Sequence, residues 1–246
     1  MTSDTPDHVS VVSTENLFGE LLSCLAEAGR SRHTVALTGG STPKAFYQWI
    51  RANGGLDPAM QEGIRWTVSD ERHVPLDSPD SNFGNADRLL LGPEGVPKAR
   101  KHAWDTTLPP AECARDYARR WAEQVGADHT YDLCFLGLGE DGHTASLFPG
   151  SPLLAEDPPE FFRSVDAGER GHRLTITPAG LARCGKIVVV ATGERKREAV
   201  ERVFLGEEEP ATCPSRLLLD FGDKVHWFLD RAAAAGLRKS RESGEE

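Results

Sequence analysis

The chain has 246 residues, of which 39% are hydrophobic and 27% charged, and its formal net charge at pH 7 is −10. This length fits one α/β domain or two small ones and is long enough to bury a substantial core. A generally acidic surface argues against nucleic acid and anionic membranes as partners, because both are bound by basic patches, but it leaves room for a small anionic substrate.

In chain order, helical and strand patterns alternate. They predict a helix over 17–28, a strand over 34–38, a helix from 42, a strand over 64–69, helices over 81–91 and 110–125, strands over 131–138 and 173–177, a helix from 177, a strand over 186–192, a helix over 194–204 and a strand over 225–229. Such alternation is typical of a mostly parallel sheet covered by helices. We expect a single α/β catalytic domain over residues 1–246, with a frayed tail over 238–246.

Residue types that are typical of helix termini predict where two of the helices begin or end. Ser13 and Thr14 are expected to cap the first helix and Gly29 to end it. In the second helix Thr42 is the expected N-cap and Pro43 the first helical residue.

Polar and glycine-rich segments follow four of these predicted elements, at 39–43, 70–72, 137–143 and 193–196. Ligands of open parallel sheets bind beyond the carboxyl ends of the strands. We therefore expect the four segments to share one site.

The turn Gly39-Gly40-Ser41-Thr42 opens a predicted helix. Its amides and hydroxyls are suited to hold a phosphate at the positive end of the helix, although a tight turn with an N-cap explains the same residues. It lacks the Gly-x4-Gly-Lys-Ser/Thr spacing of a P-loop.

Residues 137–142 match the Gly-x-Gly-x-x-Gly pattern of dinucleotide-binding proteins. Glu140 and Asp141 would repel a pyrophosphate, and Pro149 leaves little room for the helix that the motif requires. The glycines are better explained by a sharp turn that brings the backbone close to a ligand.

His143 in this loop is the candidate general base, and Asp141 is placed to orient its ring. The alternative is a loop histidine with a structural hydrogen bond. Arg72, Arg173 and Lys196 are candidate anion ligands, although each taken singly is more often a solvated charge.

Asp70 is expected to bind sugar hydroxyls or to hold Arg72, unless it is an ordinary turn residue. Neither a Gly-x-Ser-x-Gly nucleophile elbow nor a His-Glu-x-x-His zinc motif occurs. Hydrolysis at such a site would therefore use direct attack by water, with neither a covalent serine nor a metal.

The five cysteines form no Cys-x-x-Cys motif, and their odd number and wide spacing suit reduced thiols. The N-terminus lacks the apolar segment of a signal peptide, and no apolar run reaches the roughly 20 residues of a membrane span. We expect a cytoplasmic protein.

Six segments together form a longer pattern. They are Ala-Leu-Thr-Gly-Gly-Ser-Thr-Pro at 36–43, Ser-Asp-Glu-Arg at 69–72, Pro-Asp-Ser-Asn-Phe-Gly at 79–84, Gly-Leu-Gly-Glu-Asp-Gly-His-Thr-Ala-Ser-Leu-Phe-Pro-Gly at 137–150, Arg-Leu-Thr-Ile-Thr at 173–177 and Thr-Gly-Glu-Arg-Lys at 192–196. In content and order they resemble the 6-phosphogluconolactonase family. The segment at 137–150 is the longest and most specific.

The resemblance implies hydrolysis of 6-phospho-D-glucono-1,5-lactone to 6-phosphogluconate in the oxidative pentose phosphate pathway, without a cofactor. It implies a doubly wound sheet with helices on both faces, shared with glucosamine-6-phosphate deaminases. His143 would activate water and Asp141 would orient it. The substrate-binding set would be Gly39, Gly40, Ser41, Thr42, Asp70, Arg72, Arg173 and Lys196, with the phosphate among Gly40, Ser41, Thr42, Arg173 and Lys196.

Two other functions compete with this one. The deaminases of the same scaffold carry a carboxylate five residues after the loop histidine, where this chain has Phe148, and a tyrosine where it has Arg72. A non-catalytic sugar-phosphate sensor would keep the phosphate site and lose the base, whereas Asp141 and His143 are both present.

Several points stay open at the level of sequence. They are the choice between monomer and small homo-oligomer, the preference for a 1,5- or a 1,4-lactone, the oxyanion donors, the role of Arg72, and whether Glu71 or Asn82 contacts substrate.

Overall fold

The computed structural model describes residues 8–31, 33–156 and 158–237. Within them a six-stranded parallel sheet has the order β1-β9-β8-β5-β2-β3, and a smaller antiparallel sheet has the order β4-β7-β6. The strands are β1 Val9–Val12, β2 Thr34–Leu37, β3 Arg65–Val68, β4 Asp70–Arg72, β5 Leu133–Gly137, β6 Phe162–Asp166, β7 His172–Ile176, β8 Lys186–Ala191 and β9 Val225–Asp230.

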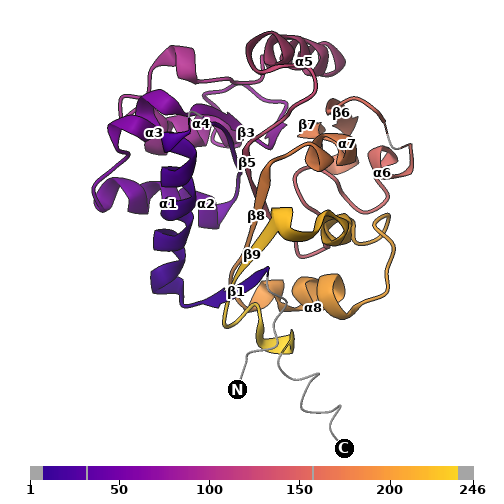
Figure 1. Cartoon of the computed structure of the whole chain (residues 1–246). Helices are drawn as coiled ribbons and strands as arrows, with labels where there is room; N and C mark the ends of the chain where they lie inside the picture. Colours follow the sequence, from indigo (N-terminus) through magenta and orange to yellow (C-terminus); the bar gives the residue numbers. More distant parts are fainter. Residues whose placement is uncertain (1–7, 32, 157, 238–246) are drawn as a thin grey trace, which may run out of the picture.

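Helices cover both faces of the large sheet, as Figure 1 shows with α1 and α2 on one side and α7 and α8 on the other. The α-helices are α1 Thr14–Arg30, α2 Ser41–Ala52, α3 Pro58–Gly63, α4 Asn82–Ala86, α5 Pro110–Val125, α6 Pro152–Ala155, α7 Pro178–Ala182 and α8 Arg197–Leu205. Further helical turns are η1 Asp87–Leu91, η2 Lys98–Arg100, η3 Gly168–Arg170, η4 Glu194–Lys196 and η5 Pro214–Lys224. The doubly wound fold is thus confirmed.

The core follows from the apolar pattern of these elements. All four residues of β2 are buried, and so are the first four of β5, because these strands are covered on both faces. From α1 the residues Leu17, Leu21 and Leu25 point into the same core, which is the helical stripe predicted from the sequence.

The strand order places a switch point between β2 and β5. From β2 the chain continues to its neighbour β3, whereas from β5 it continues to β8 on the other side. Connections that diverge in this way leave a crevice at the carboxyl ends of the two strands, which is the usual ligand site of such sheets.

The strands that carry Asp70 and Arg173 belong to the smaller sheet, which was not predicted. After Ser69 the chain leaves the large sheet, and Asp70 begins β4, which pairs antiparallel with β7. Arg173 lies in β7, opposite Arg72. Apolar patterning identifies a strand but not the strand that it pairs with.

Two predicted helix ends were wrong. The N-cap of α2 is Gly40, with φ 111°, and Thr42 instead shares a hydrogen bond with Thr192. The helix α1 continues through Gly29 to Arg30, and Gly29 packs so closely on α3 that a Cβ there would lie 3.0 Å from the backbone nitrogen of Met60.

Other elements lacked a sequence signal that we recognised: β1, α3, α6 and β6 were not predicted. The expected tail over 238–246 lies outside the described residues. In the part of the chain that is described, no helix combines the length and apolar character needed to cross a membrane.

Candidate active site

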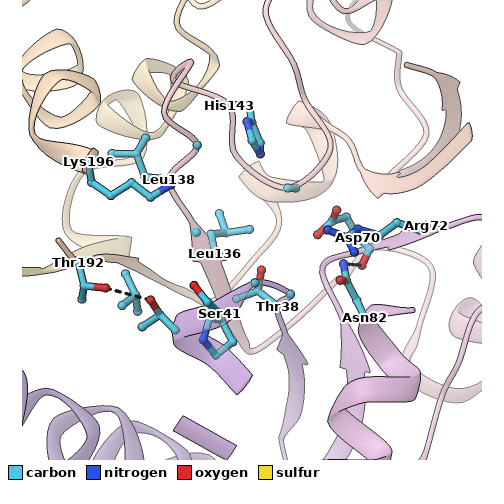
Figure 2. Close-up of a pocket in the computed structure, with 18 residues that line it drawn as sticks. Thr38, Ser41, Asp70, Arg72, Asn82, Leu136, Leu138, His143, Thr192 and Lys196 are labelled. Carbon is cyan, nitrogen blue, oxygen red and sulfur yellow. Dashed lines mark hydrogen bonds between the residues drawn. The ribbon is translucent and has the colours of Figure 1, made fainter. Parts of the chain in front are cut away.

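A pocket of about 220 Å³ opens at the switch point, beyond the carboxyl ends of β2 and β5 (Figure 2). The lining includes the turn after β2, the loop after β5, and residues from β4, α4 and the segment after β8. These residues are Thr38, Gly39, Gly40, Ser41, Thr42, Pro43, Asp70, Arg72, Asn82, Leu136, Gly137, Leu138, Gly139, His143, Ala145, Val190, Thr192 and Lys196.

His143 and Asp141 form a hydrogen-bonded pair at one wall of this pocket. Asp141 Oδ1 lies 2.5 Å from His143 Nδ1 and accepts the His143 backbone N–H at 3.1 Å. Because Nδ1 is engaged by Asp141, Nε2 is the ring nitrogen left to exchange a proton with a bound molecule. The side chains of both residues are about one-third exposed, so that solvent can reach them.

Arg170 completes the surroundings of Asp141 from the turn η3, and its Nη2 donates to Asp141 Oδ2 at 3.0 Å. Burial alone would raise the pKa of Asp141, but the hydrogen bonds from His143 and Arg170 lower it below its ordinary value. Asp141 is therefore a stable carboxylate, suited to orient a histidine rather than to donate a proton.

Glycines allow the loop to place His143 over its own backbone. A Cβ on Gly139 would lie 2.0 Å from His143 Nδ1, so that any larger residue would displace the ring. Gly142 has φ 84° and packs against Cys213. The turn is closed by Gly139 N–H, which donates to the His143 carbonyl at 2.8 Å.

The first turn of α2 forms the floor of the pocket, with Ser41 pointing into it (Figure 2). The hydroxyls of Thr42 and Thr192 lie 2.9 Å apart and join this turn to the end of β8. Gly39 is needed here because a Cβ would lie 1.9 Å from Asn82 Oδ1. The N-terminus of a 12-residue helix thus faces the pocket and favours an anion there.

Lys196 reaches the same end of the pocket from η4 (Figure 2). Burial lowers its pKa, although the nearby carboxylates Glu140 and Asp141 act in the opposite direction. The N-terminus of α2 and the Lys196 ammonium group converge there. This end of the pocket is therefore better suited to bind an anion than the opposite end, which holds Arg72.

Arg72, Asp70 and Asn82 form the opposite end of the pocket (Figure 2). Arg72 Nη1 donates to the Asp80 carbonyl at 2.7 Å. Asn82 Nδ2 donates to the Asp70 carbonyl at 2.9 Å. These contacts hold a cation and a side-chain amide at this wall.

The Asp70 carboxylate is engaged by the protein itself. It is 7% exposed and accepts hydrogen bonds from Ser146 at 2.6 Å and Ser69 at 3.3 Å. Its carboxylate thereby ties the small sheet to the loop that carries His143.

Arg173 is not among the residues that line the pocket. It lies in β7 directly opposite Arg72, and burial, together with the charges of Arg72 and Arg170, lowers its pKa. The pocket lining therefore includes Gly40, Ser41, Thr42 and Lys196 but not Arg173.

Glu71 and Asn82 were left open by the sequence. Glu71 is fully buried and accepts hydrogen bonds from the backbone of Arg72, Asn82 and Phe83 and from the Ser81 hydroxyl. Burial raises its pKa while these four donors oppose the rise. Glu71 anchors the start of α4, whereas Asn82 lines the pocket.

Three residues in or beside the site were not identified from the sequence: Arg170, Thr192 and Ala145. Thr192 sits in a motif that was recognised, but nothing indicated its contact with Thr42. Ala145 lines the pocket and has φ 46°, a conformation unusual for any residue but glycine. The partners of Arg170 are distant in sequence and could be seen only in the fold.

Comparison with known proteins gives this site a context. A family model described as glucosamine-6-phosphate isomerases/6-phosphogluconolactonase matches residues 8–227. A 6-phosphogluconolactonase of Synechocystis is 36% identical over 220 residues, which cover 87% of this chain and 88% of that protein.

Solved structures with the same fold include a 6-phosphogluconolactonase from Trypanosoma brucei, with a TM-score of 0.77 and 27% identity, covering 96% of this chain and 100% of the other. A monomeric glucosamine-6-phosphate deaminase has a TM-score of 0.75 and 19% identity over 92% of this chain and 98% of the other. At that identity the deaminase shares the fold alone.

Proposed function

The chain belongs to the glucosamine-6-phosphate isomerase/6-phosphogluconolactonase family, and from this premise we propose that it is a hydrolase that opens 6-phospho-D-glucono-1,5-lactone to 6-phospho-D-gluconate in the oxidative pentose phosphate pathway. The observation that carries the proposal is the Asp141–His143 pair, in a pocket with Lys196 at one end and Arg72 at the other. A general base between two cations suits a substrate that has a neutral lactone ring and an anionic phosphate group.

The phosphate binds at the end formed by α2 and η4. Gly40, Ser41 and Thr42 present the helix N-terminus and two hydroxyls, and Lys196 adds a positive charge. Arg173, which the resemblance also implies at the phosphate, does not line this pocket, and its contact with the phosphate stays a prediction. The lactone ring then extends toward His143.

His143 acts as the general base. His143 Nε2 takes a proton from a water molecule while the oxygen of that water attacks C1 of the lactone. The carbonyl oxygen on C1 then becomes an oxyanion. When the tetrahedral intermediate collapses, the bond between C1 and the ring oxygen breaks, and His143 returns the proton to that oxygen. Asp141 holds the ring and stabilises the imidazolium between the two steps.

Either the Arg72 side chain or the backbone amides of the glycine loop at 137–142 stabilise this oxyanion. Either source is preorganised, since Arg72 is held by the Asp80 carbonyl and the loop is closed by Gly139. Asp70, with its carboxylate engaged by Ser146, supports this wall rather than carrying the chemistry.

Deamination of glucosamine 6-phosphate is the alternative that the fold permits. Isomerising chemistry moves a proton between carbons and needs a relay of titratable groups near the base. Here the ring of Phe148 lies 4.7 Å from the His143 ring, in the position where those relatives carry a carboxylate. The aromatic neighbour favours hydrolysis. A sensor without catalysis would not need the Asp141–His143 pair.

The test compares two substrates. With freshly prepared phosphorylated lactone, the protein should accelerate acid formation far beyond the spontaneous rate, and with glucosamine 6-phosphate it should release no ammonia. Ammonia release without lactone hydrolysis would replace the proposal with the deaminase. Tight binding of 6-phosphogluconate without turnover would favour the sensor.

We also propose that the protein works in the cytoplasm as a single catalytic domain and needs no nucleic-acid or membrane partner. The net charge of −10 supports the absence of such partners. Fractionation of the source cells, with the lactonase activity in the cytosolic fraction, tests the location.

A further inference from the structure

Arg170 contacts Asp141 and Phe148 from an element that is remote in sequence. Its Nη2 lies 3.0 Å from Asp141 Oδ2, and its guanidinium carbon lies 4.4 Å from the centre of the Phe148 ring. The Phe148 ring in turn lies 4.7 Å from the His143 ring. Arg170 thus holds Asp141 directly and reaches His143 only through Asp141 and Phe148.

The two oxygens of Asp141 are divided between these partners. Oδ1 faces His143 and Oδ2 faces Arg170, so that the plane of the carboxylate is fixed from both sides. A planar guanidinium stacked on an aromatic ring is suited to this task because the stacking limits its own rotation.

The fold of the loop has other supports. The Asp141 carbonyl accepts a hydrogen bond from Arg202 of α8 at 3.3 Å, and the Gly142 carbonyl accepts the Ser215 N–H at 2.9 Å. Arg170 itself is half-exposed on the turn η3 between β6 and β7. Its replacement should therefore leave the fold and the loop in place.

We propose that Arg170 is a positioning residue of the lactonase reaction, which holds the Asp141 carboxylate in the orientation that fixes the His143 ring. The inference rests on the proposed function. The turn between β6 and β7 thereby takes part in holding the catalytic pair.

Three variants test it, with kcat and KM for the phosphorylated lactone measured separately. In Arg170→Gln, kcat should fall about tenfold, less than the roughly 100-fold cost of a misplaced catalytic group, because Asp141 still holds His143 through Oδ1. KM should stay unchanged because Arg170 does not line the pocket.

Arg170→Lys keeps a charged donor for Asp141 but lacks the planar guanidinium that stacks on Phe148, so it should restore kcat only in part. Arg163→Gln is the matched control, because Arg163 is a partly exposed arginine of the neighbouring strand β6 that pairs with Glu160. Its kcat and KM should match the wild type.

The route through Asp141 is tested by adding Arg170→Gln to Asp141→Asn. If Arg170 acts by orienting the carboxylate, the second substitution should leave kcat of the Asp141→Asn enzyme unchanged. A wild-type kcat in Arg170→Gln, or the full loss of kcat in the Asp141→Asn background, would overturn the inference alone. A wild-type protein without lactonase activity would instead overturn the proposed function.

Discussion

The Ser146 hydroxyl donates a hydrogen bond of 2.6 Å to the buried carboxylate of Asp70. The two residues are 76 positions apart, and their contact joins the small antiparallel sheet to the loop that carries His143. The Ser146 N–H also donates to Thr175 Oγ1 of β7 at 3.2 Å. Together these bonds fix the backbone next to Ala145, whose φ of 46° is held against its own preference.

Ser146→Ala should therefore weaken both the fold and the site. Without this donor the Asp70 carboxylate accepts a side-chain hydrogen bond from Ser69 alone. The free energy of unfolding, measured in urea, should fall by about 1–3 kcal/mol. The turnover number should fall as well, because the His143 loop loses its anchor. Ser164→Ala on β6 is the control and should stay within about 0.5 kcal/mol of the wild type; equal effects of the two would show that the contact with Asp70 is unimportant.

Gly139→Ala tests the geometry of the base without changing a polar group. The added Cβ would lie 2.0 Å from His143 Nδ1, and the side chain of His143 can move away while the backbone stays. We expect kcat to fall about 100-fold, as for a misplaced catalytic group, with a small change in Tm. Gly19 of α1 does not line the pocket, and an added methyl group there meets no atom within 4 Å, so Gly19→Ala should keep its Tm and its kcat. Full activity in Gly139→Ala would contradict the proposed position of His143.

Lys196→Ala tests where the phosphate binds. It should raise KM for the phosphorylated lactone far more than KM for unphosphorylated gluconolactone, because only the first carries the charge that Lys196 meets. Arg195→Ala is the neighbouring control, since Arg195 is highly exposed and pairs with Glu140. A similar rise in both KM values would remove Lys196 from the phosphate site.

Asp132 provides a prediction about pH and stability at the opposite end of β5. Burial raises its pKa, but hydrogen bonds of 2.7 and 2.8 Å from the backbone and hydroxyl of Thr34 outweigh this and lower the pKa below its ordinary value. A lowered pKa means that the folded state favours the carboxylate, so the stabilisation is complete above the unfolded value of about 3.9 and is lost as the pH falls through the folded value.

Asp132→Asn should accordingly cost about 1–3 kcal/mol at pH 7 and much less at pH 3. Asp128→Asn, at an exposed position of the preceding loop, is the control. Denaturant unfolding at the two pH values checks this, and a cost that does not depend on pH would show that the charge of Asp132 contributes nothing.

Much of the fold was accessible from the sequence because periodicity reports burial directly. The stripe of α1 and the apolar runs of β5 and β8 each predicted an element that exists, with ends displaced by a few residues. Strand pairing was not accessible, and for this reason the separate sheet that β4 and β7 form with β6 was not predicted.

The residues of the candidate site also fall into two groups, those in local sequence motifs and those defined by contacts between distant segments. His143, Asp141 and the turn at Gly39 to Thr42 lie in local motifs, and the pocket includes His143 and the turn. Arg170 and Ser146 depend on contacts between distant segments, which no local pattern encodes. Asp70 was recognised, but its engagement by Ser146 could not be.

The most direct test of the account is the turnover of freshly prepared 6-phospho-D-glucono-1,5-lactone by His143→Ala, with the spontaneous rate subtracted. His172→Ala, at an exposed position of β7, is the control and should match the wild type. We expect His143→Ala to remain folded and to lose about 100-fold or more of kcat, because general base catalysis contributes about 10²–10⁴. Turnover close to that of the wild type in His143→Ala would contradict it.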